Sequence, residues 1–212
     1  MRKTAIILAG GRGQRVQTRD KCLIPLGSKP LILHVVEKLA SVADELIVAA
    51  RDEQQGAAIS QQLPERITLV YDSIEGFGPL AGFLAGLEHA AAPYALIIGC
   101  DMPFVEPRVV ALLFAVATQR DCDAVVPQWE NGMLEPLHAV YKREPTLAAV
   151  RDAIHCGDEK LAHVLARLRH VHFLPIAELK EISPELRTFQ NINTYAELAT
   201  CTALLTQGRS GH

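Results

Sequence analysis

The stretch that decides the fold reads Ala5-Ile6-Ile7-Leu8-Ala9-Gly10-Gly11-Arg12-Gly13-Gln14-Arg15 and continues to Asp20-Lys21. Its first part, residues 5–9, is a short apolar run with β-branched residues, which predicts a buried strand. The two glycines after it allow a ligand to approach the backbone closely. Four cations follow within ten residues, namely Arg12, Arg15, Arg19 and Lys21. Exposed backbone N–H groups beside four cations favour a bound polyanion, for which a polyphosphate is the obvious candidate.

The same stretch has a simpler interpretation, in which the glycines form an ordinary turn and the cations are solvated. It is not a P-loop, because no Gly-Lys-Ser/Thr follows the glycines. It also departs from the dinucleotide-binding fingerprint, because the third glycine is missing after Gly11 and Gly13. The glycine-rich stretch therefore predicts phosphate binding but matches neither of these two known phosphate-binding motifs.

Composition limits the class of protein. The chain has 212 residues, of which 49% are hydrophobic and 21% charged, and its net charge is -3. These values indicate a globular protein with a real core, and argue against a general nucleic-acid binder. Residues 1–4 are basic, but the apolar run after them is too short for a signal peptide, and no run approaches a membrane span. We expect a cytoplasmic protein with no membrane or nucleic-acid partner.

Short apolar runs alternate with helical patterns along the first part of the chain. Strands are expected at residues 5–9, 45–50, 67–71, 94–99 and 123–127, and helices at 31–42, 53–62, 80–91 and 107–119. This alternation predicts an α/β fold with a mainly parallel central sheet and helices on both faces. Further on we expect strands at 137–141 and 171–174, and helices at 144–155, 159–168 and 195–205. One domain over 1–206 and a frayed tail at 207–212 complete the prediction.

Polar residues follow three of the expected strands. Gly10 follows the first, Asp72 the third and Asp101 the fourth. Ligands of parallel sheets bind outside the carboxyl ends of the strands, so these residues mark a predicted site. Asp101 could bind Mg²⁺, which takes one or two carboxylates together with phosphate oxygens and water. Alternatively it caps a turn.

Asn191 and Asn193 alternate along the chain, so they face the same side if the segment is extended. One of them could help to bind the metal ion. In the other interpretation both bond only to backbone at the junction before the last helix.

Other reactive side chains give weaker signals. The five cysteines form no C-x-x-C pair, so a disulfide framework or zinc site is not expected. We interpret Cys100 as a packing residue. The eight histidines are scattered and are expected to be surface or partly buried residues rather than ligands. No nucleophilic triad is evident.

Four motifs in order carry a family resemblance that covers residues 4 to about 199. They are Leu8-Ala9-Gly10-Gly11…Arg15…Asp20-Lys21, Gly78-Pro79-Leu80-Ala81-Gly82, Cys100-Asp101-Met102-Pro103 and Asn191-Ile192-Asn193-Thr194. Together they resemble the MobA-like nucleotidyltransferases, and most of all the molybdenum cofactor guanylyltransferases among them. The resemblance implies a Rossmann-like nucleotidyltransferase fold and Mg²⁺-dependent transfer of GMP from GTP to molybdopterin. It further implies partner proteins that deliver molybdopterin or receive the finished cofactor.

The resemblance also implies roles for individual residues. Nucleotide contacts are expected at Leu8, Ala9, Gly10, Gly11, Arg15, Lys21, Asp72 and Asp101. Of these, Arg15, Lys21 and Asp101 are the expected catalytic residues. Asp101 and Asn193 are the expected metal ligands, and the acceptor side is expected at Pro79, Leu80, Ala81, Gly82 and Glu135.

The chain departs from the family pattern in ways that leave the base and the acceptor open. Arg15-Val16-Gln17 stands where Arg-Met-Gly is usual, Ala49-Ala50-Arg51 lacks a common Asn, and Met133-Leu134-Glu135-Pro136 varies locally. One alternative is therefore a cytidylyltransferase, or another nucleotidyltransferase with a different phosphorylated acceptor. Another is a non-catalytic nucleotide-binding protein. The Gly10-Gly11 pair favours guanylyl transfer.

Overall fold

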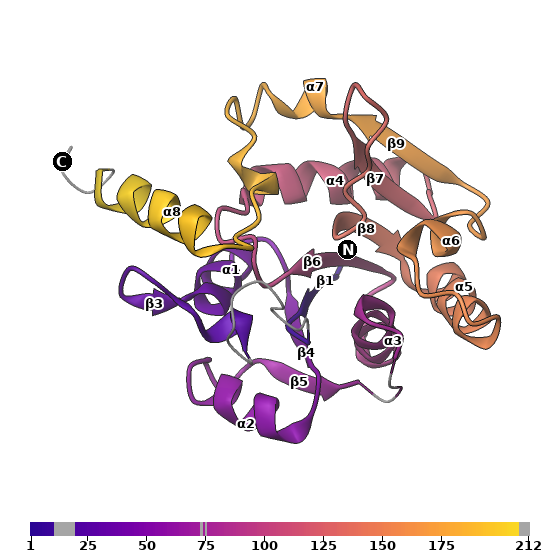
Figure 1. Ribbon diagram of the computed structural model, residues 1–212. Helices are drawn as coiled ribbons and strands as arrows, with labels where there is room; N and C mark the ends of the chain where they lie inside the picture. Colours follow the sequence, from indigo (N-terminus) through magenta and orange to yellow (C-terminus); the bar gives the residue numbers. More distant parts are fainter. Residues whose placement is uncertain (11–19, 73, 75, 208–212) are drawn as a thin grey trace.

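The computed structural model describes residues 1–10, 20–72, 74 and 76–207, with only the backbone of 204–207. Seven strands form the central sheet: β1 (Lys3–Leu8), β4 (Glu45–Ala50), β5 (Thr68–Tyr71), β6 (Tyr94–Gly99), β7 (Ala124–Gln128), β8 (His138–Lys142) and β9 (Val171–Pro175). The larger helices are α1 (Leu31–Leu39), α2 (Glu53–Ser60), α3 (Pro79–His89), α4 (Pro107–Gln119), α5 (Arg143–His155) and α8 (Tyr195–Gln207). Figure 1 shows the helices arranged around the sheet.

The strand order is β5-β4-β1-β6-β8-β7-β9. The first four strands are parallel, and β7 pairs in parallel with β9. Strand β8 runs antiparallel to both β6 and β7. This confirms the mainly parallel α/β sheet. The antiparallel strand follows from a short connection, because only nine residues separate β7 from β8 and a parallel crossover needs a dozen or more.

Both faces of the sheet are buried, as continuous apolar strands require. In β1 the side chains alternate, so that Ile7 packs in one core cluster and Ile6 in the other. Helices α1, α2 and α4 cover the first face with residues such as Val35 and Val109. Helices α3, α5 and α6 (Leu161–Leu165) cover the second face, where Phe83 packs edge-on against Tyr141 at 5.0 Å between ring centroids. The expected helices on both faces are confirmed.

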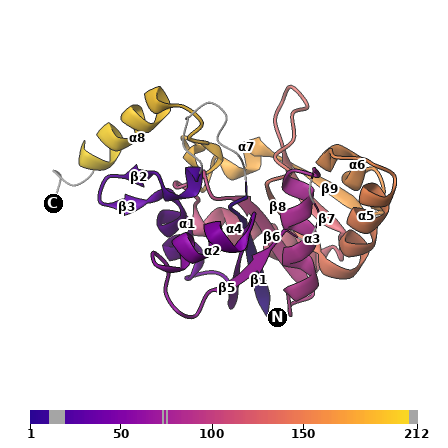
Figure 2. The same ribbon diagram turned by 60° about the horizontal axis from the view of Figure 1, so that its bottom comes forward.

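Small elements after the glycine-rich stretch were not predicted. A 3-10 turn, η1 (Lys21–Leu23), leads into a hairpin of β2 (Pro25–Leu26) and β3 (Lys29–Pro30). Helix α8 packs on this hairpin through Cys201, with Leu26 and Ile192 in the same small apolar cluster. Figure 2 shows α8 beside β2 and β3. The last part of the chain is thereby tied to the segment that follows the glycine-rich stretch.

Some predicted boundaries were wrong. Helix α1 ends at Leu39 rather than at residue 42, and α6 is shorter than the predicted helix at 159–168. Two short elements, α7 (Ile176–Leu179) and η2 (Arg187–Phe189), were missed. Gln207, assigned to the tail, ends α8, and 208–212 lie outside the described residues. A single domain over 1–206 stays a prediction. No helix in the described part of the chain is long and apolar enough to cross a membrane.

Candidate active site

The carboxyl ends of the parallel strands bring the predicted polar residues to one edge of the sheet. Strand β1 ends against β6, where the Cys100 N–H donates to the Leu8 carbonyl at 3.1 Å. It also ends against β4, where the Ala9 N–H donates to the Ala49 carbonyl at 2.8 Å. The Asp72 N–H continues this edge with a bond of 3.0 Å to Ala50. Gly10, Asp72 and Asp101 therefore follow strands that end together, as expected for a ligand site.

Lys21 is the centre of the described site. Its Nζ forms an ion pair with the Asp101 carboxylate and donates to Asn193 Oδ1 at 2.7 Å. The lysine side chain is only 11% exposed, and the Asp101 side chain is 22% exposed. Asp101 and Asn193 lie 80 and 172 positions after Lys21 in the sequence, and both side chains contact its ammonium group. A partly buried, charge-assisted contact of this kind fixes both side chains more firmly than a surface ion pair would.

Local structure explains why these three side chains meet. The turn η1 begins at Lys21, with Leu23 N–H donating to Asp20 C=O at 3.1 Å. The Ile192 N–H donates to the Asp101 carbonyl at 3.0 Å, which joins the segment before α8 to the end of β6.

A hydrogen bond with Cys22 and burial raise the pKa of the Cys100 thiol. Cys100 is therefore a neutral packing residue, as predicted.

The turn before α8 holds the backbone of Asn193. Glu197 Oε2 accepts from the N–H groups of Asn193 at 2.6 Å and Thr194 at 2.9 Å. The Glu197 N–H in turn donates to Thr194 Oγ1 at 3.2 Å, which completes a capping box. The bonds from Asn193 and Thr194 lower the pKa of Glu197, so its carboxylate stays ionised. Thr194 therefore caps the start of α8.

The side-chain oxygens of Asp101 and Asn193 fit a magnesium site that takes only two ligands from the protein. Asp101 contributes a carboxylate and Asn193 an amide oxygen, and both lie within reach of one cation, the Lys21 ammonium. Within the described ranges no group of three or more His, Cys, Asp or Glu side chains could hold a metal by itself. Mg²⁺ commonly binds one or two carboxylates and completes its shell with phosphate oxygens and water. The residues present suit a metal ion that arrives with a polyphosphate.

Asp72 occupies a second part of the site, between two glycines. A Cβ on Gly10 would lie 3.0 Å from Asp72 Oδ2, and one on Gly82 would lie 3.2 Å from Asp72 Oδ1. The carboxylate is half-buried, and its Oδ1 is buried without a hydrogen-bond partner among the described residues. Burial raises the pKa of Asp72 to about 6, although nearby Arg51 opposes the shift. A buried acceptor without a donor is costly, so Asp72 Oδ1 is suited to accept a hydrogen bond from a ligand.

The predicted acceptor residues of the second glycine-rich loop lie in the first turn of α3. Leu80 and Ala81 are buried at 0% and 2% exposure, so their side chains belong to the core. Their N–H groups donate to Phe77 and Gly78 within the turn. Pro79 is exposed. A role for residues 79–82 towards the acceptor stays a prediction, and Pro79 is the side chain open to a ligand.

Glu135 lies at the same edge, before β8. Its Oε1 accepts from Trp129 Nε1 at 2.7 Å, and burial raises its pKa. Trp129 also meets Phe189 edge-on, with 5.9 Å between ring centroids. The sequence interpretation missed Trp129 and Phe189, because a single aromatic residue in a loop carries no periodic signal.

His138 corrects one prediction. The histidines were expected to be surface or partly buried residues, but His138 is fully buried on β8, and in the part of the chain that the structure describes its Nδ1 has no hydrogen-bond partner. Its Nε2 lies 3.4 Å from Thr188 Oγ1, and its ring packs on Phe189 at 4.8 Å. Burial lowers the pKa of His138 to about 3, so the ring is neutral at physiological pH. The burial of His138 could not be predicted, because one polar residue beside apolar ones in a strand does not show whether its side chain faces the core or solvent.

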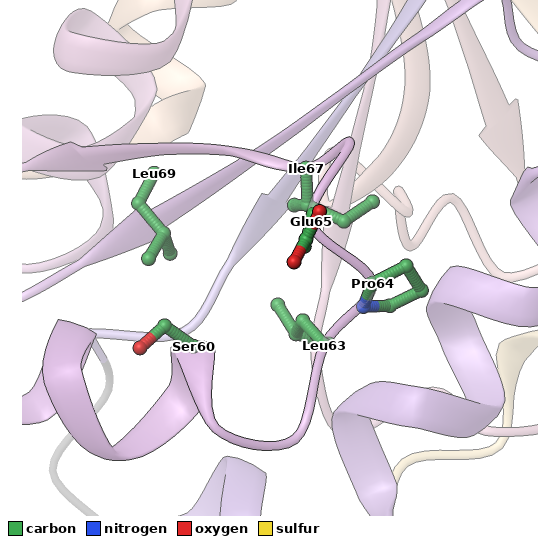
Figure 3. Close-up of a pocket in the computed structure, with 6 residues that line it drawn as sticks. All are labelled: Ser60, Leu63, Pro64, Glu65, Ile67 and Leu69. Atoms are coloured by element: carbon green, nitrogen blue, oxygen red, sulfur yellow. The ribbon is translucent and has the colours of Figure 1, made fainter.

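Two predicted residues, Gly11 and Arg15, lie outside the described residues. One pocket of about 240 Å³ lies elsewhere, between the end of α2 and the start of β5. Figure 3 shows its lining, which is mostly apolar and includes Leu63, Pro64 and Ile67. Its lining residues lie around the amino end of β5, whereas Asp72 follows the carboxyl end of that strand, so the pocket is not part of the candidate site.

Comparison with known proteins identifies the family. The model of the MobA-like NTP transferase domain matches residues 5–173. The chain belongs to the MobA-like NTP transferase family. A probable molybdenum cofactor guanylyltransferase of Methanosarcina mazei is 38% identical over 200 residues, which are 92% of this chain and 88% of the relative. A molybdenum cofactor guanylyltransferase of Burkholderia ambifaria is 34% identical over 203 residues, 92% of this chain and 93% of the relative. The predicted family resemblance is confirmed.

Solved structures agree with this placement in the MobA-like family. Molybdopterin-guanine dinucleotide biosynthesis protein A from Archaeoglobus fulgidus has a TM-score of 0.84 and 30% identity, covering 96% of this chain and 99% of that one. A 4-diphosphocytidyl-2C-methyl-D-erythritol synthase from Anaerococcus prevotii has a TM-score of 0.70 at 15% identity, covering 97% and 96%. The second likeness shows the nucleotidyltransferase fold alone.

Proposed function

We propose that this chain transfers GMP from GTP to molybdopterin, giving molybdopterin guanine dinucleotide and pyrophosphate. The observation that carries the proposal is the Lys21 ammonium fixed between Asp101 and Asn193 at the carboxyl edge of the sheet. A fixed cation beside a carboxylate that can take a metal ion suits phosphoryl chemistry. The names of the family relatives, which are molybdenum cofactor guanylyltransferases, support guanine and molybdopterin as the substrates.

The proposed step joins two anions. A phosphate oxygen of molybdopterin attacks the α-phosphorus of GTP and forms a new P–O bond. The bond from the α-phosphorus to the oxygen that bridges to the β-phosphate breaks, and pyrophosphate leaves with that electron pair. The barrier falls when positive charge is fixed beside the phosphates and the attacking oxygen is aligned. An ionised phosphate already carries the attacking electron pair, so the step requires no general base.

Lys21 neutralises phosphate charge in this proposal, because its ammonium is held in place before the ligand arrives. Arg15 would add a second cation and Gly11 a backbone donor. The backbone of residues 8–10 would contact the nucleotide. Asp72 would accept hydrogen bonds from the nucleoside, because its buried Oδ1 has no donor among the residues that the structure describes. Residues 79–82 and Glu135 would border the acceptor.

Mg²⁺ is the proposed cofactor, with Asp101 and Asn193 as its protein ligands. When bound, it supplies further positive charge to the phosphate oxygens. The protein's own part is to hold the Asp101 carboxylate in place, through the backbone bond from Ile192 and the ion pair with Lys21. A cytoplasmic location, and partner proteins that deliver or receive the cofactor, remain predictions.

Nucleotide selectivity tests the proposal. GTP, CTP, ATP and UTP are titrated separately into the purified protein by calorimetry, with and without Mg²⁺. We expect GTP to bind most tightly of the four nucleotides. Mg²⁺ should strengthen GTP binding by the wild type but not by Asp101→Asn. Tightest binding of CTP would replace guanylyl by cytidylyl transfer, an alternative left open because Ala50 ends β4 without the asparagine common in the family. If GTP binds but no pyrophosphate is released when molybdopterin is added, the chain is a non-catalytic nucleotide-binding protein.

A further inference from the structure

Gln55 is a buried polar side chain to which the proposed chemistry assigns no role. It lies in the first turn of α2 and is 1% exposed. Its Nε2 donates to the Ala9 carbonyl at 3.1 Å and to Asp20 Oδ1 at 3.0 Å. Its Oε1 accepts from the Arg51 N–H at 2.7 Å. A carbonyl and a carboxylate can only accept and a backbone N–H can only donate, so these partners fix the orientation of the amide.

Helix capping explains only part of this arrangement. Asp52 is the N-cap of α2, and its Oδ1 accepts from the Gln55 N–H at 2.7 Å. In an ordinary capping box the glutamine side chain turns back to the backbone at the cap. Here only Oε1 does so, since it accepts from the residue before the cap. The Nε2 group instead reaches two segments that lie 46 and 35 residues away in sequence.

Those two segments flank the glycine-rich stretch in the sequence. Ala9 comes directly before Gly10, and Asp20 comes directly before Lys21. A second side chain supports the same link, because Arg51 Nη2 donates to Asp20 Oδ1 at 3.3 Å while its Nε donates to Asp52 at 2.9 Å. The end of β1 and the start of η1 are thereby joined through the turn that precedes α2.

We infer that Gln55 is a positioning residue for nucleotide binding: one amide sets the distance between the Ala9–Gly10 backbone and Lys21. The inference rests on the proposed function, because it takes residues 8–10 and Lys21 as nucleotide contacts. Loss of the two Nε2 bonds frees the backbone before Gly10 and the residue before Lys21 together. The expected defect is therefore weaker binding of GTP by a chain that still folds.

The test compares GTP affinity, measured by calorimetry with Mg²⁺, in matched variants. Gln55→Glu keeps the shape and the bond from Arg51 but removes both Nε2 donors and faces Asp20 with a second carboxylate. Gln54→Glu makes the same charge change at an exposed position of the same helix and is the control. Asp20→Asn in the Gln55→Glu background restores one bond with donor and acceptor exchanged. Gln55→Met removes the donors without adding charge, and serves if Gln55→Glu does not fold.

We expect the dissociation constant for GTP to rise about 10- to 100-fold in Gln55→Glu, as for the loss of hydrogen bonds that include a charged partner. Asp20→Asn should recover part of that loss, and Gln54→Glu should bind as wild type does. Recovery by exchange separates positioning from a general loss of stability, which is followed by thermal unfolding of the same samples.

Unchanged affinity in Gln55→Glu or Gln55→Met, beside a wild type that binds GTP, overturns the inference and leaves the proposed function intact. An affinity loss that Asp20→Asn does not reduce also overturns it. A wild type that binds no GTP overturns the proposed function and this inference together.

Discussion

Replacing Asp72 by asparagine should stabilise the free protein at neutral pH and weaken GTP binding. Burial raises the pKa of Asp72 from 3.8 to about 6. Its ionised form is therefore less favourable in the folded chain than in the unfolded chain. Because asparagine has nearly the same shape and no charge, the variant removes this unfavourable burial and still fits the space beside Gly10 and Gly82.

The sign and the pH window follow from linkage. Well below pH 3.8 the carboxyl is protonated in both states and has no effect on stability. As the pH rises from about 4 to about 6, the folded protein loses stability, because only the unfolded chain releases its proton readily. Two pH units at about 1.4 kcal/mol each give about 3 kcal/mol. Asp72 is only half-buried, so solvent screening reduces this to about 1–2 kcal/mol.

Denaturant unfolding of wild type and Asp72→Asn, from pH 4 to pH 8, measures the effect. The two free energies of unfolding should differ least near pH 4, and the variant should be more stable by about 1–2 kcal/mol above pH 7. GTP affinity at pH 7.5 should fall about 10- to 100-fold, because the nucleoside loses a charged acceptor. A stability difference that does not change with pH, or a variant that is less stable at pH 8, would refute the reasoning.

Three other variants test separate parts of the site and the core. Lys21→Met should lower the rate of pyrophosphate release about 10²- to 10³-fold, as for loss of a single electrostatic donor, with an unchanged far-ultraviolet spectrum; near-normal turnover would remove Lys21 from the mechanism. Gly99→Ala places a Cβ 2.5 Å from Asp101 Oδ1, so the carboxylate must shift. The kcat of Gly99→Ala should fall while its melting temperature stays close to that of wild type. A kcat equal to that of wild type would mean that the position of Asp101 is not critical. His138 has a pKa lowered by burial to about 3, so wild type should lose stability as the pH falls from 6.5 towards 4. In His138→Phe acid unfolding should shift to lower pH, and identical acid profiles would contradict the buried neutral histidine.

The strands could be predicted because their apolar runs are short and continuous. Residues 94–99 and 45–50 were placed at the observed bounds of β6 and β4. The nine-residue connection from β7 favours an antiparallel direction for β8, but the pattern within the strand does not show that it also pairs with β6. The β2–β3 hairpin was missed because two-residue strands are too short for any periodicity.

The candidate site was predictable where residues follow strands directly. Asp72 and Asp101 were found in this way, since strand order alone brings their positions to one edge. The link from Lys21 to Asn193 depends on tertiary contacts across most of the chain. Gln55 lay within the helix predicted at 53–62. The one available signal was Asp52 followed three residues later by glutamine, which predicts a helix start but not the contacts of Nε2.

The most direct test of the central claim is product formation. Purified protein is incubated with Mg²⁺, molybdopterin and an equimolar mixture of GTP and CTP, and the dinucleotide products are identified by mass spectrometry while pyrophosphate is counted. We expect molybdopterin guanine dinucleotide as the main product, one pyrophosphate released for each dinucleotide, and loss of both in Asp101→Asn. A cytosine dinucleotide as the main product, or nucleotide binding with no product, would contradict the proposed function.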